Sequence, residues 1–88
     1  MTYIKDPDAI LDYSINWSSW LVTGDTITTS TWTAEAGIMI DSDTNTTTAT
    51  TVWLSGGTAG ESYDVTNHIV TDDGREDDRT ITILVREQ

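Results

Sequence analysis

The stretch "SGGTAGESYDV", residues 55–65, decides how the fold of this chain is interpreted. Small residues and glycines lead into Tyr63, and Val65 follows two positions later. Immunoglobulin-like sandwiches have such a tyrosine near the start of the penultimate strand, where its hydroxyl bonds back to the backbone a few residues upstream. We therefore predict a tyrosine corner at Tyr63, with Gly60 among the glycines that let the chain turn tightly beneath the ring.

Apolar and polar residues alternate along most of the chain, which is typical of strands with one buried face. In "LDYSINWS" (11–18) the side chains at odd positions are apolar and those at even positions are polar. Ile27 and Trp32 cannot share a face of a regular strand, so we expect a bulge or a strand switch near Thr29. Structural positions in the core are predicted for Leu11, Tyr13, Ile15, Trp17, Trp32, Ile38, Ile40, Thr50, Val52, Leu54, Tyr63, Val65, Asn67, Ile69, Ile81, Ile83 and Val85.

Six or seven short strands with turn signals between them predict an all-β fold. We expect an immunoglobulin-like antiparallel β-sandwich with a tyrosine corner, forming one domain over residues 11–88. Residues 42–46 are predicted to be a polar loop and residues 72–78 a charged hairpin loop. Residues 1–10 are expected to form an N-terminal arm or an edge strand, because Pro7 cannot donate a ladder hydrogen bond. Alternation fixes faces but not neighbours, so the strand order stays open.

Composition limits the function classes open to these 88 residues. Fifteen acidic residues against four basic ones give a formal net charge of −11, which opposes binding to nucleic acid and to anionic membranes. The absence of cysteine excludes disulfides, thiolate metal sites and thiol catalysis, and it favours folding in a reducing cytoplasm. No apolar run has the length of a transmembrane helix or a signal-peptide core.

The residue pattern predicts no active site and no cofactor. His68 is the only histidine, and alternation places it on the outer face of its strand. Residues 41–52 begin like an EF-hand loop, but Thr46 and Val52 stand where that loop requires glycine and a bidentate glutamate. The five carboxylates of residues 72–78 are interpreted as a solvated hairpin tip. We therefore expect neither an enzyme nor a metal site.

Several large apolar residues are left outside the predicted core, and clustered apolar surface commonly marks a partner site. Trp53 lies between two residues of the inward set, so the pleat turns it outward, and the same argument applies to Met39 and Leu84. Trp20 follows the first clear strand, where it either contacts a partner or plugs one open end of the sandwich. Partner contacts are predicted for Tyr3, Ile4, Trp20, Met39, Trp53 and Leu84.

Three segments resemble a family of small bacteriophage proteins described as fibre-tail adaptor proteins. They are "KDPDAILDYSINWSSWL" (5–21), "GDTITTSTWTAEAGIMIDSDTNTTTATTVWLSGGTAGESYDVTN" (24–67) and "GREDDRTITILVRE" (74–87), which form one collinear run over nearly the whole chain. The resemblance implies a virion structural protein of the tail or neck, made in the host cytoplasm. It implies a ring of identical copies that joins a fibre or another tail component, and it offers no catalytic residues.

The leading hypothesis is an assembly module that binds other phage structural proteins through its apolar patches and its N-terminal arm. The alternative is a capsid decoration or carbohydrate-binding module on the virion surface, because exposed Trp rings can stack on sugars. A regulatory protein that mimics nucleic acid is disfavoured, since its acids would need to form one stripe and are instead scattered through nearly every loop.

Overall fold

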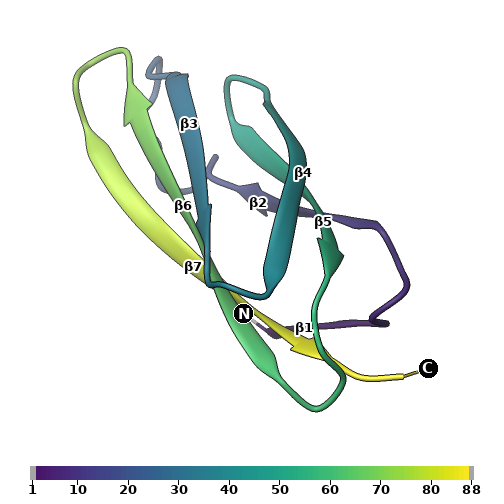
Figure 1. Cartoon of the computed structure of the whole chain (residues 1–88). Helices are drawn as coiled ribbons and strands as arrows, with labels where there is room; N and C mark the ends of the chain where they lie inside the picture. Colours follow the sequence, from purple (N-terminus) through teal and green to yellow (C-terminus); the bar gives the residue numbers. More distant parts are fainter. Residues whose placement is uncertain (1, 88) are drawn as a thin grey trace.

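The computed structural model describes residues 2–87, which form seven β-strands in two sheets (Figure 1). The all-β prediction is confirmed. Residues 2–87 contain no helix, and hence none of the length and apolarity that crossing a membrane requires. In chain order the strands are β1 (Thr2–Lys5), β2 (Leu11–Asn16), β3 (Ile27–Ala34), β4 (Ile38–Asn45), β5 (Ala49–Gly56), β6 (Ser62–Thr71) and β7 (Glu76–Val85).

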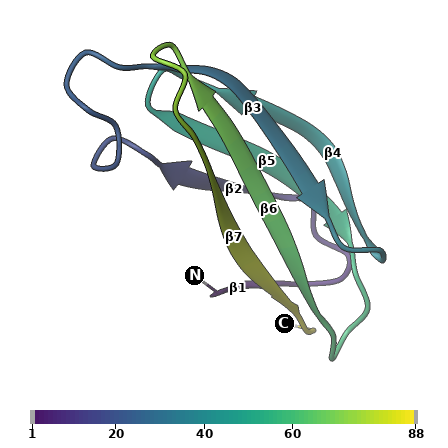
Figure 2. The same cartoon turned by 90° about the vertical axis from the view of Figure 1, so that its left-hand side faces the viewer.

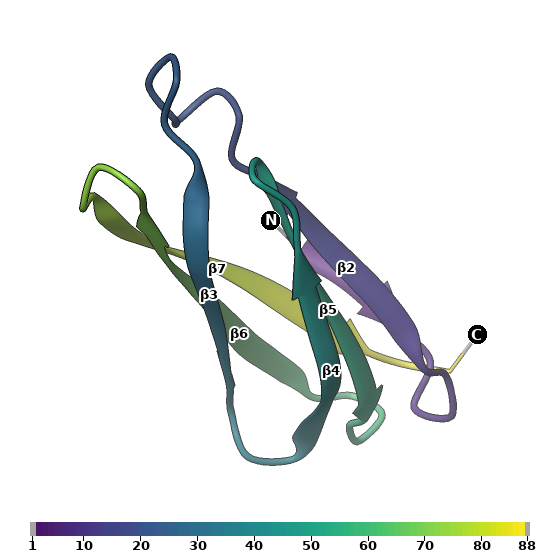
Figure 3. The same cartoon turned by 90° about the horizontal axis from the view of Figure 1, so that it is seen from above.

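The two sheets form two layers that Figures 2 and 3 show from further directions. One sheet has the strand order β1-β7-β6-β3, and the other has the order β2-β5-β4. Strands two to seven are divided between the sheets as strands B to G are in an immunoglobulin constant-type domain, which supports the immunoglobulin-like interpretation. One pair departs from the antiparallel prediction, because β1 runs parallel to β7 at the edge of the four-stranded sheet.

Two strands contain a register shift. The irregularity that the sequence predicts near Thr29 is present, since the pairing of β3 with β6 shifts between Ile27 and Thr29. A second shift, which alternation did not predict, lies in β4 between Ile40 and Ser42. Such bulges bend a strand and increase its twist.

Two hairpins have longer strands than the sequence predicts. The prediction of a loop at residues 42–46 is wrong, because β4 stays paired with β5 as far as Asn45. The prediction of a loop at residues 72–78 is also wrong, because β7 begins at Glu76, which pairs with Val70. In both hairpins the missed strand residues are exposed on both faces, so no apolar alternation marks them.

The core lies between the sheets and consists almost entirely of the predicted inward residues. Leu11 is an exception, because it begins the edge strand β2 and remains 40% exposed. Ile40 and Trp32 are partly buried against the core. The buried hydrophobic residues are Tyr13, Ile15, Trp17, Ile27, Ile38, Val52, Leu54, Tyr63, Val65, Ile69, Ile81, Ile83 and Val85.

A buried hydrogen-bond network crosses the core from one sheet to the other. The side-chain oxygen of Asn67 on β6 accepts hydrogen bonds from Trp17 Nε1 at 3.1 Å and from the hydroxyl of Thr50 on β5 at 2.7 Å. Its amide nitrogen donates to Ser30 Oγ and to the Thr31 carbonyl of β3, both at 3.0 Å. These four bonds use the two donors and two acceptor sites of the amide. The network therefore links β5 and the end of β2 to β6 and β3.

Tyr63 makes a backbone bond of the kind that a tyrosine corner makes. Its hydroxyl oxygen accepts a hydrogen bond from the N–H of Thr58 at 3.0 Å, in the crossover between β5 and β6. A Cβ added at Gly37 would lie 2.8 Å from the ring, and one added at Gly57 would lie 3.5 Å from it. Gly60 has a φ of 90°, but an added Cβ there would meet no described atom within 4 Å. The close approach to the ring is therefore made by Gly37 and Gly57.

Candidate interaction surfaces

The outer face of the three-stranded sheet brings two of the predicted partner residues together. Met39 on β4 pairs with Ser55 on β5, and Trp53 lies two positions before Ser55 on the same face. Met39 is 64% exposed and Trp53 is 39% exposed. Ile10 is 61% exposed and directly precedes β2, whose Asp12 pairs with Trp53. We refer to Met39 and Trp53 as the apolar face.

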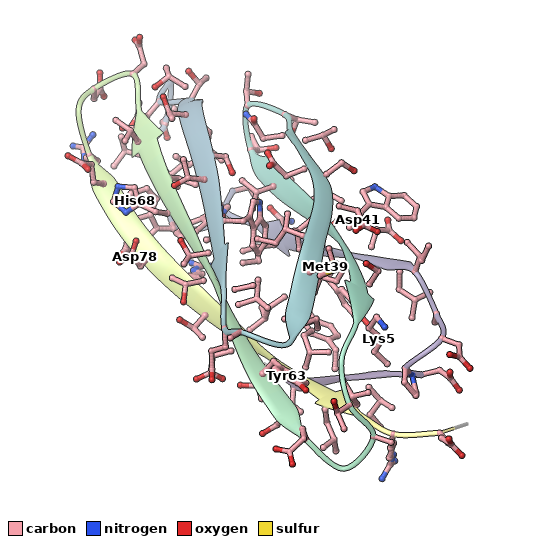
Figure 4. The ribbon with its side chains drawn as sticks, viewed as in Figure 1. Lys5, Met39, Asp41, Tyr63, His68 and Asp78 are labelled. Atoms are coloured by element: carbon pink, nitrogen blue, oxygen red, sulfur yellow. The ribbon has the colours of Figure 1, made fainter. Side chains whose placement is uncertain are left out.

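Negative charge borders the apolar face. Asp12 lies opposite Trp53 on β2, and Asp41 lies at the bulge of β4 on the other side of β5. Ser55 donates a hydrogen bond to Asp41 Oδ1 at 2.8 Å, which holds this carboxylate beside the outer face. Figure 4 shows Asp41 on one side of the molecule and His68 on the other. β2, β4 and β5 contain no Lys or Arg, so every formal charge on these strands is negative.

Lys5 is withdrawn from the surface, between the two sheets. It ends β1 and is fully buried, and its Nζ donates to the carbonyls of Gly56 at 2.7 Å and Asp6 at 2.9 Å. Burial lowers the pKa of Lys5, while the charges of nearby carboxylates act in the opposite direction. The bond to Gly56 joins β1 of one sheet to β5 of the other. Arg86, another of the four bases, follows β7, and its backbone N–H donates to the Lys5 carbonyl.

The side chains of the other two bases, Arg75 and Arg79, are bound within the chain. Arg75 Nη1 lies 3.4 Å from a carboxylate oxygen of Asp25 and 3.3 Å from one of Asp73. The guanidinium carbon of Arg79 lies 4.3 Å from the ring centre of Trp17, within the range of a cation–π interaction. Neither arginine belongs to the sheet that presents the apolar face.

The remaining predicted partner residues lie away from the apolar face. Ile4 and Leu84 pair on the outer face of the four-stranded sheet, where Ile4 is 41% exposed and Leu84 is half-buried. Tyr3 is directed inward with Ile83, and its ring centre lies 5.1 Å from that of Tyr13. These positions divide the predicted set between two opposite faces and the interior.

Trp20 packs at the end of the sandwich. Its ring centre lies 5.4 Å from that of Trp17 at an angle of 74°, an edge-to-face arrangement. The backbone N–H of Trp20 donates to the Trp17 carbonyl at 2.9 Å, and the side chain is half-buried against the core. Trp20 thus contacts the core, as the plug alternative requires.

Away from Ile4 and Leu84, polar side chains cover much of the outer face of the four-stranded sheet. Thr33, Thr66 and Thr80 form one row across β3, β6 and β7. Further along, His68 Nδ1 lies 2.5 Å from Asp78 Oδ1, and Nε2 lies 2.9 Å from Glu76 Oε1 (Figure 4 labels His68 and Asp78). These hydrogen bonds to Asp78 and Glu76 raise the pKa of His68 above its ordinary value of 6.5. Residues 2–87 form no pocket and no group of three His, Cys, Asp or Glu side chains suited to a metal ion.

Asp25 joins the connection between β2 and β3 to the β6–β7 hairpin. Its Oδ1 accepts hydrogen bonds from the N–H groups of Thr26 at 3.0 Å and Asp73 at 3.1 Å. Burial acts to raise the pKa of Asp25, but hydrogen bonds from Thr71, Asp73, Thr26 and Arg75 outweigh it and lower the pKa below its ordinary value. This carboxylate is therefore used to hold two loops together.

Sequence reasoning missed two residues that shape the candidate site. In the sequence, Asp12 and Asp41 are two of fifteen acidic residues spread along the chain, although the alternation of residues 11–18 indicates that Asp12 faces outward. Their position beside Trp53 depends on the pairing of β2 and β4 with β5, which a single sequence does not give.

The matched part of the chain includes the entire apolar face and Tyr63 with its bond to Thr58. Residues 5–84 match the sequence family described as "Podophage GP4 fiber-tail adaptor protein gp77". The chain belongs to this family. The resemblance to fibre-tail adaptors that the sequence segments indicated is thereby confirmed. No curated protein gives a significant sequence match.

Proposed function

We propose that this protein is a structural component of the phage tail that joins fibre proteins or other tail proteins by protein–protein contact. Membership of the fibre-tail adaptor family supports this role. The observation on which the proposal rests most directly is the apolar face, where Met39 and Trp53 lie exposed on adjacent strands. Tryptophan is enriched among the residues that dominate binding energy at interfaces, and methionine adapts to irregular partner surfaces.

An adaptor that joins two components needs two surfaces. The apolar face lies on the outer side of the three-stranded sheet, and Ile4 with Leu84 lies on the outer side of the four-stranded sheet. We assign a second, smaller contact to Ile4 and Leu84. The proposal includes a location in the virion tail or neck, synthesis in the host cytoplasm and assembly of copies in a ring, with no catalytic activity.

A capsid decoration or carbohydrate-binding module is the second candidate function. One observation favours it, because the exposed ring of Trp53 lies beside Asp12 and Ser55, which can hydrogen-bond to sugar hydroxyls. Met39 on the same face disfavours it, since a flexible apolar side chain makes no directional bond to a sugar. Binding of labelled particles to a glycan array, with label over the capsid in electron micrographs, would favour this candidate over the adaptor.

The experiment uses phage that lacks its own copy of the gene and receives each variant from a plasmid. Trp53→Ser and Met39→Ser are compared with Val22→Ser, a matched control because Val22 is 43% exposed and lies in the connection between β2 and β3. We measure copies per purified particle by quantitative mass spectrometry and locate them with gold-labelled antibody. Loss of the tail or neck label with Trp53→Ser, but not with Val22→Ser, supports the proposal. Normal incorporation of both apolar-face variants would overturn it.

A further inference from the structure

We propose that the apolar face binds a different protein, one whose apolar depression is rimmed by Lys and Arg side chains, and not a second copy of this chain. This inference rests on the proposed function, because it assigns the chemistry of the partner at the same surface. It follows from the placement of charge around Trp53 and from the internal use of the basic residues.

The strands that form this surface carry only negative formal charges. Asp12 on β2 and Asp41 on β4 flank the strand that bears Trp53, and no base lies on β2, β4 or β5. A contact in which two copies use the same face would bring these carboxylates toward the same carboxylates of the other copy. Like charges placed together across an interface are unfavourable by several kcal/mol. A symmetric self-contact through this face is therefore disfavoured.

A contact between the apolar face and some other surface of a second copy is disfavoured as well. Such a surface would need basic side chains, but Lys5 is fully buried between the sheets. Arg75 is bound to carboxylates of its own chain, and Arg79 lies over the ring of Trp17. Only Arg86 of the four bases is not held in this way by a side-chain contact described for residues 2–87. The chain thus offers its own apolar face almost no complementary charge.

A partner with basic side chains around an apolar depression complements both the carboxylates and the apolar side chains of this surface. Lys or Arg at the rim would pair with Asp12 and Asp41, and an apolar depression between them would receive Trp53 and Met39. Rim charges of this kind act mainly on the rate of association and on its dependence on salt. The net charge of −11 adds a long-range attraction for a cationic surface, which is screened beyond about 8–10 Å at physiological salt.

Charge reversal in the same particle assay tests the inference. Asp12→Lys with Asp41→Lys is compared with Glu61→Lys plus Asp72→Lys, which makes the same change in net charge at two exposed loop positions. We expect copies per particle to fall by more than about tenfold for the first pair and by less than about twofold for the control pair. Urea unfolding of each purified variant checks that any loss does not come from misfolding, and the milder pair, Asp12→Asn with Asp41→Asn, should give an intermediate fall. Equal incorporation of both reversal pairs would overturn the inference.

Two outcomes separate this inference from the proposed function. If Trp53→Ser lowers incorporation while reversal of Asp12 and Asp41 does not, the surface binds a partner but the partner is not basic. Photo-crosslinking then identifies the partner, with p-benzoylphenylalanine in place of Met39 in assembled particles. A crosslink to a different protein at a peptide rich in Lys and Arg supports the inference, and a crosslink to a second copy of this chain refutes it while leaving the adaptor role intact.

Discussion

Replacing Asn67 with leucine removes the centre of the network that joins the two sheets. Asn67 and Thr50 are fully buried, and the amide makes four hydrogen bonds of 2.7 to 3.1 Å. Each is worth about 0.5–1.5 kcal/mol net, and a buried group left without a partner costs about 1–3 kcal/mol. The hydroxyl of Thr50 loses its acceptor, whereas Trp17 Nε1 keeps a 3.3 Å contact with Thr50. Allowing for the added apolar surface of leucine, we expect a loss of about 3 kcal/mol.

Urea unfolding followed by tryptophan fluorescence measures this loss. With a slope of about 1–1.5 kcal/mol per molar urea for a domain of this size, the midpoint should fall by roughly 2–3 M. Thr66→Val is the control, because Thr66 precedes Asn67 on the exposed face of β6, and it should change stability by less than about 0.5 kcal/mol.

A double-mutant cycle with Thr50→Val distinguishes a network from independent contacts. Once the partner has been removed, the second substitution should cost at least about 1 kcal/mol less than it does alone. A cost for Asn67→Leu below about 1 kcal/mol, or strict additivity with Thr50→Val, would refute the reasoning.

Three further predictions use the same unfolding assay. Gly57→Ala should lower the free energy of unfolding by about 2–4 kcal/mol, because φ is 94° and the new Cβ would lie 2.7 Å from Val85 Cγ2. Gly24→Ala, at a φ of 87° in open space, should lower it by only about 1–2 kcal/mol. Equal losses would contradict the packing argument. Trp32→Phe should cost about 1 kcal/mol or less, because it deletes a buried indole N–H that has no hydrogen-bond partner among residues 2–87, while Trp17→Phe should cost about 2–4 kcal/mol; the reverse order would show that Trp32 contributes more than its packing indicates. Because the pKa of His68 is raised in the folded state, its contribution to the free energy of unfolding should be complete below about pH 6.5 and disappear as the pH rises through the folded pKa. The difference in unfolding free energy between the natural chain and His68→Gln should therefore be larger near pH 5.5 than near pH 9. A difference independent of pH would exclude the ion pairs as its source.

The sequence could predict most faces of the strands, because period-2 alternation is a local property of the chain. Trp53 between two buried neighbours is the clearest example. Alternation could not predict where β4 and β7 extend past the core. Consecutive residues there, among them Asp43 and Asp77, are exposed whichever face of the sheet they point to. It also could not pair β1 with β7, because parallel neighbours need not be adjacent in sequence.

The sequence could predict which residues of the candidate site face outward, but not that they lie together on one surface. Alternation within each strand predicts that Met39 and Trp53 face outward, and both side chains are exposed. Their proximity depends on the pairing of Met39 with Ser55, and the position of Asp41 depends on the bulge between Ile40 and Ser42. Both are long-range properties that alternation within one strand does not contain.

The strand that presents Trp53 is fixed at both ends by bonds to the opposite sheet. Near one end, Thr50 donates to Asn67 at 2.7 Å, and at the other end the Gly56 carbonyl accepts from Lys5 at 2.7 Å. A side chain on a strand held in this way loses little backbone freedom when a partner binds, so more of its buried area contributes to affinity. Lys5, which fixes β5, is fully buried, so its charge is withdrawn from the surface. The bond from Lys5 to Gly56 therefore both helps to hold the strand of Trp53 and keeps a positive charge away from the surface. The formal charges on the strands around Trp53 are all carboxylates.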